Sequence, residues 1–299
     1  MFIRRLPKFE YRSAASVAEA LDLLKKYGTK ARVIAGGTDL LLAMKKRALT
    51  PGYLINVKNI KVMKGISYNE KKGLRIGSLV TIAELEESAL VKEKAPALWD
   101  AALVMASPQV RTLATIGGNL VSAVPSADTA PPLIAMGAEA VLSGPKGERT
   151  MLVEKLFKGP AESKVARNEI LTHIMIPKQP PKSCAAYLKL MRRAALDLAL
   201  VGVAAYVCLD KDNATCKDIR IALGAVAPTP VRAPQAEKML IGKEISEALA
   251  DEAGKVAVTL CSPITDLRAT LGYRCDMIEV LTRRAVMEAL SRAKNGTTR

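Results

Sequence analysis

The stretch VIAGGTDL, residues 33–40, contains the first of two short glycine loops in this chain. Residues 31–35 (ARVIA) are apolar enough to form a short strand, and Gly36 and Gly37 follow directly. Because glycine has no Cβ, the backbone N–H groups of such a turn can converge on one phosphate oxygen. The loop lacks the GxGxxG of a Rossmann turn and the GK[ST] ending of a nucleoside-triphosphate loop. Taken alone, the pair equally fits an ordinary tight turn.

The second glycine loop, TIGGN at residues 115–119, repeats the hydroxyl and the Gly-Gly pair about eighty residues later. Two such loops with the same chemistry would let a diphosphate be held from both sides. Asp128, ten residues after Gly118, could accept a hydrogen bond from a ribose hydroxyl. The alternative for Asp128 is a capping role at the start of a helix over residues 129–136.

Length and hydrophobicity limit the class of protein. The chain has 299 residues, of which 49% are hydrophobic, so it can bury a large core divided into two or three lobes. The longest apolar run, residues 198–209, is shorter than the roughly 20 residues that span a bilayer and reads as a buried strand. The N-terminal segment is charged and lacks the apolar stretch of a secretory signal. We therefore expect a cytoplasmic protein without a transmembrane segment.

Charge and rare residues argue against several functions. The net charge is +16, but the basic residues are dispersed, without interleaved aromatic residues or a basic tail. This pattern favours solvated faces and attraction to an anionic cofactor or acidic partner over nucleic-acid binding. The five cysteines show no CxxC pairing, and His173 is the single histidine. We expect no disulfide framework, no metal site and no acid–base chemistry by histidine.

Hydrophobic periodicity and capping residues predict a mixed order of helices and strands. Helices are expected at residues 16–27 (capped by Ser16), 40–46, 81–88 (capped by Thr81), 94–105, 246–260 and 276–293. Strands are expected at residues 31–35, 53–57, 73–77, 139–142, 185–191, 199–209 and 219–226, with a polar loop at 107–119 and a linker at 178–182.

Three ordered segments resemble one family closely. Residues 33–40 (VIAGGTDL), 107–119 (SPQVRTLATIGGN) and 125–133 (PSADTAPPL) are similar to the FAD-binding subunits of molybdenum hydroxylases. This group includes the medium subunit of aerobic carbon monoxide dehydrogenase and the flavin domain of xanthine dehydrogenase. The resemblance covers essentially the whole chain, including residues 187–197 (YLKLMRRAALD).

The resemblance implies an α+β, vanillyl-alcohol-oxidase-type (PCMH-type) FAD-binding fold. Two lobes, residues 1–57 and 58–177, would clasp an extended FAD. A C-terminal lobe, residues 178–299, would contain a three-stranded antiparallel sheet and helices. One subgroup carries an extra iron–sulfur cluster in this subunit, but no cysteine precedes Cys184 here, so we do not expect that cluster.

Site residues follow from the resemblance position by position. The first diphosphate loop comprises Val33, Ile34, Ala35, Gly36, Gly37, Thr38, Asp39 and Leu40. The second comprises Thr115, Gly117, Gly118 and Asn119, and Asp128 takes the ribose role. Leu171 matches an apolar contact to the flavin ring. Lys189 matches a lysine near the polar edge of the ring, where a cation would stabilise negative charge; its alternative is a solvated strand lysine. Met105 occupies a position that is aromatic in some relatives.

The implied function is electron transfer. FAD would be bound non-covalently, since neither glycine loop contains a cysteine. It would receive electrons from iron–sulfur clusters of a small subunit, which take them from a molybdenum cofactor in a large subunit, and pass them to an external acceptor. The resemblance also implies a dimer of heterotrimers. A self-sufficient FAD-dependent oxidoreductase of the same fold remains the alternative, although the C-terminal lobe shows no clear set of substrate-binding residues.

Overall fold

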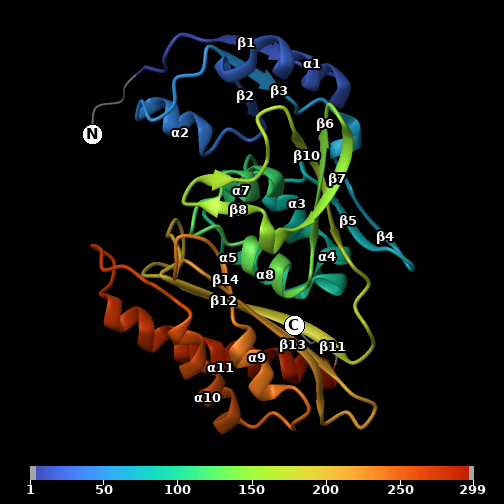
Figure 1. Ribbon diagram of the computed structural model, residues 1–299, viewed down its shortest axis with the longest axis vertical. Helices are drawn as coiled ribbons and strands as arrows, with labels where there is room; N and C mark the ends of the chain where they lie inside the picture. Colours follow the sequence, from blue (N-terminus) through green and yellow to red (C-terminus); the bar gives the residue numbers. More distant parts are fainter. Residues whose placement is uncertain (1–4, 296–299) are drawn as a thin grey trace.

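The N-terminal sheet lies at one end of the long axis of the molecule in the computed structural model, which describes residues 5–295 (Figure 1). Its strands are parallel, in the order β1 (Glu10–Ser13), β3 (Tyr53–Asn56), β2 (Ala31–Ile34). The same region contains two helices, α1 (Val17–Tyr27) and α2 (Leu40–Lys45), and two 3-10 turns, η1 (Gly28–Lys30) and η2 (Lys61–Met63). Ser16 caps α1 as predicted, since its Oγ accepts from the N–H of Glu19 at 3.1 Å. Strand β1 was not predicted, because all four of its residues are exposed.

The middle sheet is antiparallel, in the order β4 (Ile66–Asn69), β5 (Gly73–Gly77), β10 (Ile170–Ile176), β6 (Glu139–Gly144), β7 (Gly147–Leu152). Its helices are α3 (Ile82–Glu87), α4 (Ala89–Lys94), α5 (Pro96–Val104), α6 (Pro108–Arg111), α7 (Ile116–Val121) and α8 (Ala130–Ala135). A 3-10 turn, η3 (Val153–Lys155), precedes a hairpin of β8 (Phe157–Gly159) and β9 (Glu162–Ser163).

Two predictions for this region need correction. The helix predicted at residues 94–105 begins at Pro96, because proline lacks an N–H and suits a first turn, and α4 ends at Lys94. The segment predicted as a loop at residues 107–119 contains helix α6 and the start of helix α7. Thr81 caps α3 through a complete capping box with Glu84, as predicted.

The C-terminal sheet is antiparallel, in the order β11 (Ser183–Leu190), β12 (Val201–Leu209), β13 (Cys216–Gly224), β14 (Val231–Arg232). Helices α9 (Pro234–Leu240), α10 (Glu247–Thr259) and α11 (Leu271–Asn295) follow. The sheet lies between the middle lobe and helices α10 and α11 (Figure 1). This explains why β12 is buried at every residue, since both of its faces are covered.

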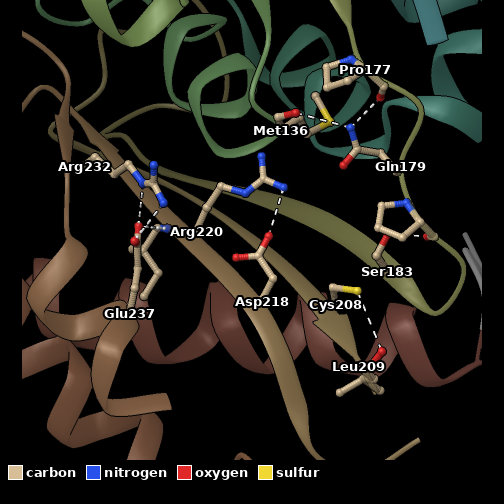
Figure 2. Close-up of polar contacts among 12 residues, drawn as sticks. Met136, Pro177, Gln179, Ser183, Cys208, Leu209, Asp218, Arg220, Arg232 and Glu237 are labelled. Atoms are coloured by element: carbon tan, nitrogen blue, oxygen red, sulfur yellow. Dashed lines mark hydrogen bonds and ion pairs between the residues drawn. The ribbon is translucent and has the colours of Figure 1, made fainter. Parts of the chain in front are cut away.

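The three long strands match the predicted sheet, and β14 adds a fourth strand that is too short for a sequence pattern to reveal. Figure 2 shows what holds it. The guanidinium of Arg232 forms two hydrogen bonds, of 2.9 and 3.0 Å, to the Glu237 carboxylate on α9. Glu237 Oε1 also accepts from the N–H of Ile221 on β13 at 2.9 Å. An ion pair therefore supports this edge of the sheet.

The middle and C-terminal lobes share one hydrophobic core. Tyr187, Ala204 and Tyr206 of the C-terminal sheet belong to the same buried cluster as Leu74 and Ile174 of the middle sheet. The linker between the lobes is also attached, because the Gln179 side-chain amide donates to the carbonyl of Met136 at 3.2 Å (Figure 2). The shared core and this hydrogen bond hold the C-terminal sheet against the middle lobe.

Candidate functional site

The first glycine loop leaves its backbone donors free. Among residues 5–295, no acceptor is found for the N–H groups of Gly36, Gly37, Thr38 and Asp39. The carbonyls of Gly37 and Asp39 are used instead, accepting from Leu41 and Ala43 at the start of α2, both at 2.9 Å. Gly37 has a φ of 77°, in the left-handed region. Successive free N–H groups around a left-handed residue form a concavity suited to an anion.

The second glycine loop is built differently. Thr115 is the N-cap of α7, and its Oγ1 accepts from the N–H of Gly118 at 3.1 Å. The N–H of Gly117 donates to the carbonyl of Ser78 at 2.9 Å, and that of Asn119 donates to the carbonyl of Thr115 at 2.9 Å. The expectation that both loops offer the same chemistry is therefore wrong. In the second loop, the backbone N–H groups of Gly117, Gly118 and Asn119 all donate to acceptors within the protein. The donor that remains is the side-chain amide of Asn119, whose Oδ1 accepts from the hydroxyl of Thr129.

The structure brings the two loops side by side. A Cβ on Gly36 would lie 2.0 Å from the carbonyl oxygen of Leu113, two residues before Thr115. A Cβ on Gly117 would lie 2.6 Å from the Cβ of Ser78. These two positions are glycine because protein atoms approach them closely. Gly118 differs, since a Cβ there would meet only the Thr115 hydroxyl, at 3.0 Å, and the residue is otherwise exposed.

Asp128 and Lys189 meet in a buried ion pair. Lys189 Nζ lies 2.8 Å from Asp128 Oδ2, with side chains 0% and 6% exposed. Tyr187, two residues before Lys189 on β11, donates its hydroxyl to Asp128 Oδ1 at 2.9 Å. Burial raises the pKa of Asp128, and the charge and hydrogen bond of Lys189 act against that rise. Burial and the negative charge of Asp128 raise the pKa of Tyr187 well above its ordinary value.

These contacts overturn two alternatives. Lys189 is not a solvated strand lysine, because its ammonium also donates to the carbonyls of Val104 and Asp197, both at 3.1 Å. Asp128 does not cap α8, whose N-cap is Thr129 and carries no side-chain cap. The three donors of the ammonium are matched by three protein acceptors, so Lys189 acts on a neighbouring group through its charge.

Leu171 and Met105 lie in the core of the middle lobe. Leu171 lies on β10, is 4% exposed and belongs to the cluster that joins the middle and C-terminal lobes. Met105 is 8% exposed in the same cluster. The residues that sequence reasoning missed are Tyr187, Asp197, Asp100 and Arg292. The first two lie inside the quoted segment 187–197, whereas Asp100 and Arg292 are far apart in sequence and carry no local signal.

Among residues 5–295, no three His, Cys, Asp or Glu side chains are grouped so that they could hold a metal ion. Over the same residues, no helix is both long and apolar enough to cross a bilayer.

Comparison with known proteins identifies the family. The family described as "FAD binding domain in molybdopterin dehydrogenase" matches residues 7–179, and "CO dehydrogenase flavoprotein C-terminal domain" matches residues 186–289. The carbon monoxide dehydrogenase medium chain of Hydrogenophaga pseudoflava is 35% identical over 96% of this chain and 98% of its own. The putative xanthine dehydrogenase FAD-binding subunit of Escherichia coli K12 is 31% identical over 95% and 96%.

Solved structures of a molybdenum-dependent dehydrogenase and of an oxidoreductase have the same fold as this chain. A carbon monoxide dehydrogenase from Hydrogenophaga pseudoflava that lacks the Mo-pyranopterin moiety of the molybdenum cofactor superposes with a TM-score of 0.92 at 35% identity, covering 97% of this chain and 99% of the other. Quinoline 2-oxidoreductase from Pseudomonas putida 86 gives 0.89 at 28% identity, covering 97% and 99%. The chain therefore belongs to the family of FAD-binding flavoprotein subunits of molybdenum-dependent dehydrogenases, which are oxidoreductases.

Proposed function

We propose that the two glycine loops of this chain hold the diphosphate of FAD. The observation that carries the assignment is the row of four free N–H groups at Gly36, Gly37, Thr38 and Asp39, beside the second loop. Backbone N–H groups that converge in this way suit phosphate oxygens. On the second loop, the Asn119 amide and the exposed surface of Gly118 would complete the binding site. The remaining predicted loop residues, Val33, Ile34, Ala35, Leu40, Thr115 and Gly117, would support the two loops.

Asp128 was predicted to bind the ribose and Lys189 to lie near the flavin ring. Because the two side chains lie 2.8 Å apart, we assign both to the ring end of the cofactor, where Asp128 would face hydroxyls of the ribityl chain instead of the ribose. Each carboxylate oxygen of Asp128 accepts one hydrogen bond from the protein, which leaves lone pairs for a hydroxyl. Lys189 would place a fixed positive charge beside the ring, and Leu171 an apolar contact. The positive charge of Lys189 and the remaining lone pairs of Asp128 support this assignment. When bound, FAD supplies the capacity to accept and donate electrons, and the protein supplies position and electrostatics.

The function we propose is electron transfer within a multi-subunit dehydrogenase. Electrons would arrive from iron–sulfur clusters of a small subunit and a molybdenum cofactor of a large subunit, and leave to an external acceptor. Support comes from relatives that are named as subunits or medium chains and that match over nearly their whole length. This favours a subunit over a self-sufficient oxidoreductase. The cytoplasmic location, the dimer of heterotrimers and the three lobe boundaries stay predictions.

Anaerobic flavin absorbance tests the subunit assignment. The isolated full-length chain with FAD should not be bleached by aldehydes, purines or other hydroxylase substrates. Addition of the small and large subunits should restore bleaching that depends on substrate. Rapid bleaching of the isolated chain by an organic substrate would instead establish a self-sufficient enzyme. Acid precipitation of the same sample tests the mode of attachment, because non-covalent FAD should appear entirely in the supernatant.

A further inference from the structure

Strand β11 is an edge strand, yet two of its outward-facing backbone groups have side-chain partners. The N–H of Tyr187 donates to Asp100 Oδ2 at 3.1 Å, and the carbonyl of Ala185 accepts from Arg292 Nη1 at 3.1 Å. Asp100 lies on α5 of the middle lobe and Arg292 near the end of α11. The two residues thus take the place of a neighbouring strand, which would otherwise provide these hydrogen bonds.

Asp100 and Arg292 are themselves a buried ion pair. Arg292 Nη1 lies 2.7 Å from Asp100 Oδ2 and Nη2 lies 3.3 Å from Oδ1, with side chains 7% and 9% exposed. Arg292 Nε also donates to Glu288 at 2.9 Å. A fork of this kind has little freedom to move, because both groups are planar and each has further partners. We name Asp100 and Arg292 the β11 clamp.

The β11 clamp binds the backbone of the same short segment of β11 that carries Tyr187 and Lys189, the two partners of Asp128. Tyr187, whose N–H the clamp holds, donates its hydroxyl to Asp128. Side chains two residues apart on a strand point to the same face, so Tyr187 and Lys189 both reach Asp128 from β11. Gly202 on β12 makes room for the ring, since a Cβ there would lie 2.5 Å from the Tyr187 hydroxyl oxygen. A displacement of β11 would therefore move both partners of Asp128 together.

We propose that Asp100 and Arg292 are positioning residues for the flavin, which set the place of Lys189 and Asp128 by holding strand β11. The proposal rests on the assignment of the Asp128–Lys189 pair to the ring end of FAD. Neither clamp residue needs to touch the cofactor. Loss of the clamp loosens the strand, the Lys189 charge moves relative to the ring, and reduced FAD, which carries more negative charge, loses more stabilisation than oxidised FAD.

The far edge of the same sheet offers a matched control. There Glu237 pairs with Arg232 (Figure 2) and accepts from the N–H of Ile221. The arrangement parallels Asp100, which pairs with Arg292 and accepts from the N–H of Tyr187. This pair also joins a helix to the sheet, but among residues 5–295 no hydrogen bond or ion pair links either member to β11, Asp128 or Lys189. The control pair is less buried than the clamp, because the Arg232 side chain is 32% exposed and also lies 3.8 Å from Glu154. It therefore controls for the loss of a pair that joins a helix to this sheet, and the redox ratio, not the loss of stability, is the quantity compared.

The experiment compares Asp100→Leu/Arg292→Met with Glu237→Leu/Arg232→Met in the full-length chain. Replacing both members avoids an unpaired buried charge, so the fold should persist. The readout is the ratio of reduced-FAD to oxidised-FAD affinity, obtained from the midpoint potentials of bound and free FAD. We expect the ratio to fall about threefold or more in the clamp variant, against about tenfold in Lys189→Met, which is about 1.4 kcal/mol. The control should lose thermal stability and keep its ratio.

The outcomes separate the inference from the site assignment. An unchanged ratio in Lys189→Met would overturn the flavin-end assignment, and the inference with it. A fall in Lys189→Met without a fall in the clamp variant, or an equal fall in the control, would overturn the inference alone. If the double variant does not fold, Asp100→Asn replaces it. Its amide oxygen can still accept from Tyr187, but the amide nitrogen that replaces the other oxygen cannot accept from Arg292, so the clamp is weakened and not removed. This variant should lower the ratio in the same direction by a smaller factor, and an unchanged ratio would overturn the inference.

Discussion

Lys189 Nζ lies 2.8 Å from Asp128 Oδ2, although the two residues are 61 positions apart and come from different lobes. The pair lies at the seam where the C-terminal sheet meets the middle lobe, and Tyr187 completes it. Because its three acceptors are protein oxygens, the ammonium is fixed in one place. A fixed charge at a lobe seam can influence a cofactor only if both lobes keep their relative positions, so the packing of the sheet matters for the site.

Removing one member of this pair should destabilise the protein strongly. Lys189→Met leaves the Asp128 carboxylate buried with only Tyr187 as partner, and the expected loss is about 3–5 kcal/mol of unfolding free energy. Lys189→Met/Asp128→Asn should recover part of that loss, because no unpaired charge remains. Urea denaturation of the flavin-free chain measures both. Equal stability of Lys189→Met and the unaltered chain would show that the pair does not form.

Gly118→Val should weaken FAD binding more than it weakens the fold. The new side chain meets only the Thr115 hydroxyl within the protein, and points into the surface assigned to the diphosphate. We expect a loss of at least about tenfold in FAD affinity, or about 1.4 kcal/mol, measured by flavin fluorescence titration. Gly159→Val, at an open position on β8, is the control and should bind FAD normally. Full FAD occupancy in Gly118→Val would exclude this loop from the diphosphate site.

Gly202→Ala should act through Tyr187. The added methyl would lie 2.5 Å from the Tyr187 hydroxyl oxygen, so the ring must shift and its hydrogen bond to Asp128 is lost. Tyr187→Phe removes the same bond directly, at a cost of about 1–3 kcal/mol because a buried acceptor loses its partner. The double variant Gly202→Ala/Tyr187→Phe should be less destabilised than the sum of the two single variants. Additive losses in thermal unfolding would show that Gly202 serves another contact.

Protonation of Glu169 at acid pH should lower the free energy of unfolding of the protein. Its carboxylate accepts two hydrogen bonds from Arg149, of 2.6 and 2.8 Å, and one from the N–H of Ala166. The hydrogen bond from Arg149 is the main reason that the pKa of Glu169 is lowered, whereas its partial burial opposes the shift. A lowered pKa in the folded state adds stability above the ordinary pKa of a glutamate, and this stability disappears as the pH falls through the lowered value.

Glu169→Gln should therefore be less stable than the unaltered chain at pH 7, and the difference should shrink below about pH 4.5. Urea midpoints measured from pH 7 to pH 3 check this expectation. Glu148→Gln on the neighbouring strand β7 is the control, because among residues 5–295 Glu148 accepts no side-chain hydrogen bond. A gap between Glu169→Gln and the unaltered chain that stays constant with pH would mean that the ion pair does not contribute.

Much of this protein was determined by local sequence. The turn around Gly36 and Gly37 follows an apolar strand, Ser16 and Thr81 cap their helices as their spacing predicts, and the apolar run in residues 198–209 forms strand β12. These features depend on neighbours within a few residues, so periodicity and capping chemistry are sufficient to reveal them. The family resemblance also rests on contiguous segments.

Only the tertiary structure decided which hydrogen bonds and ion pairs the site residues form. The second glycine loop looks like the first in sequence, but Ser78 and Val80 accept its N–H groups, and that depends on a strand end some forty residues away. The sequence left Lys189 between a lysine near the flavin ring and a solvated strand lysine, and only its contacts with Asp128, Val104 and Asp197 exclude the second. Asp100 and Arg292 are 192 positions apart and meet only because α5 and α11 pack against one edge strand. Hydrogen-bond occupancy and burial depend on contacts between distant segments, and no local pattern records them.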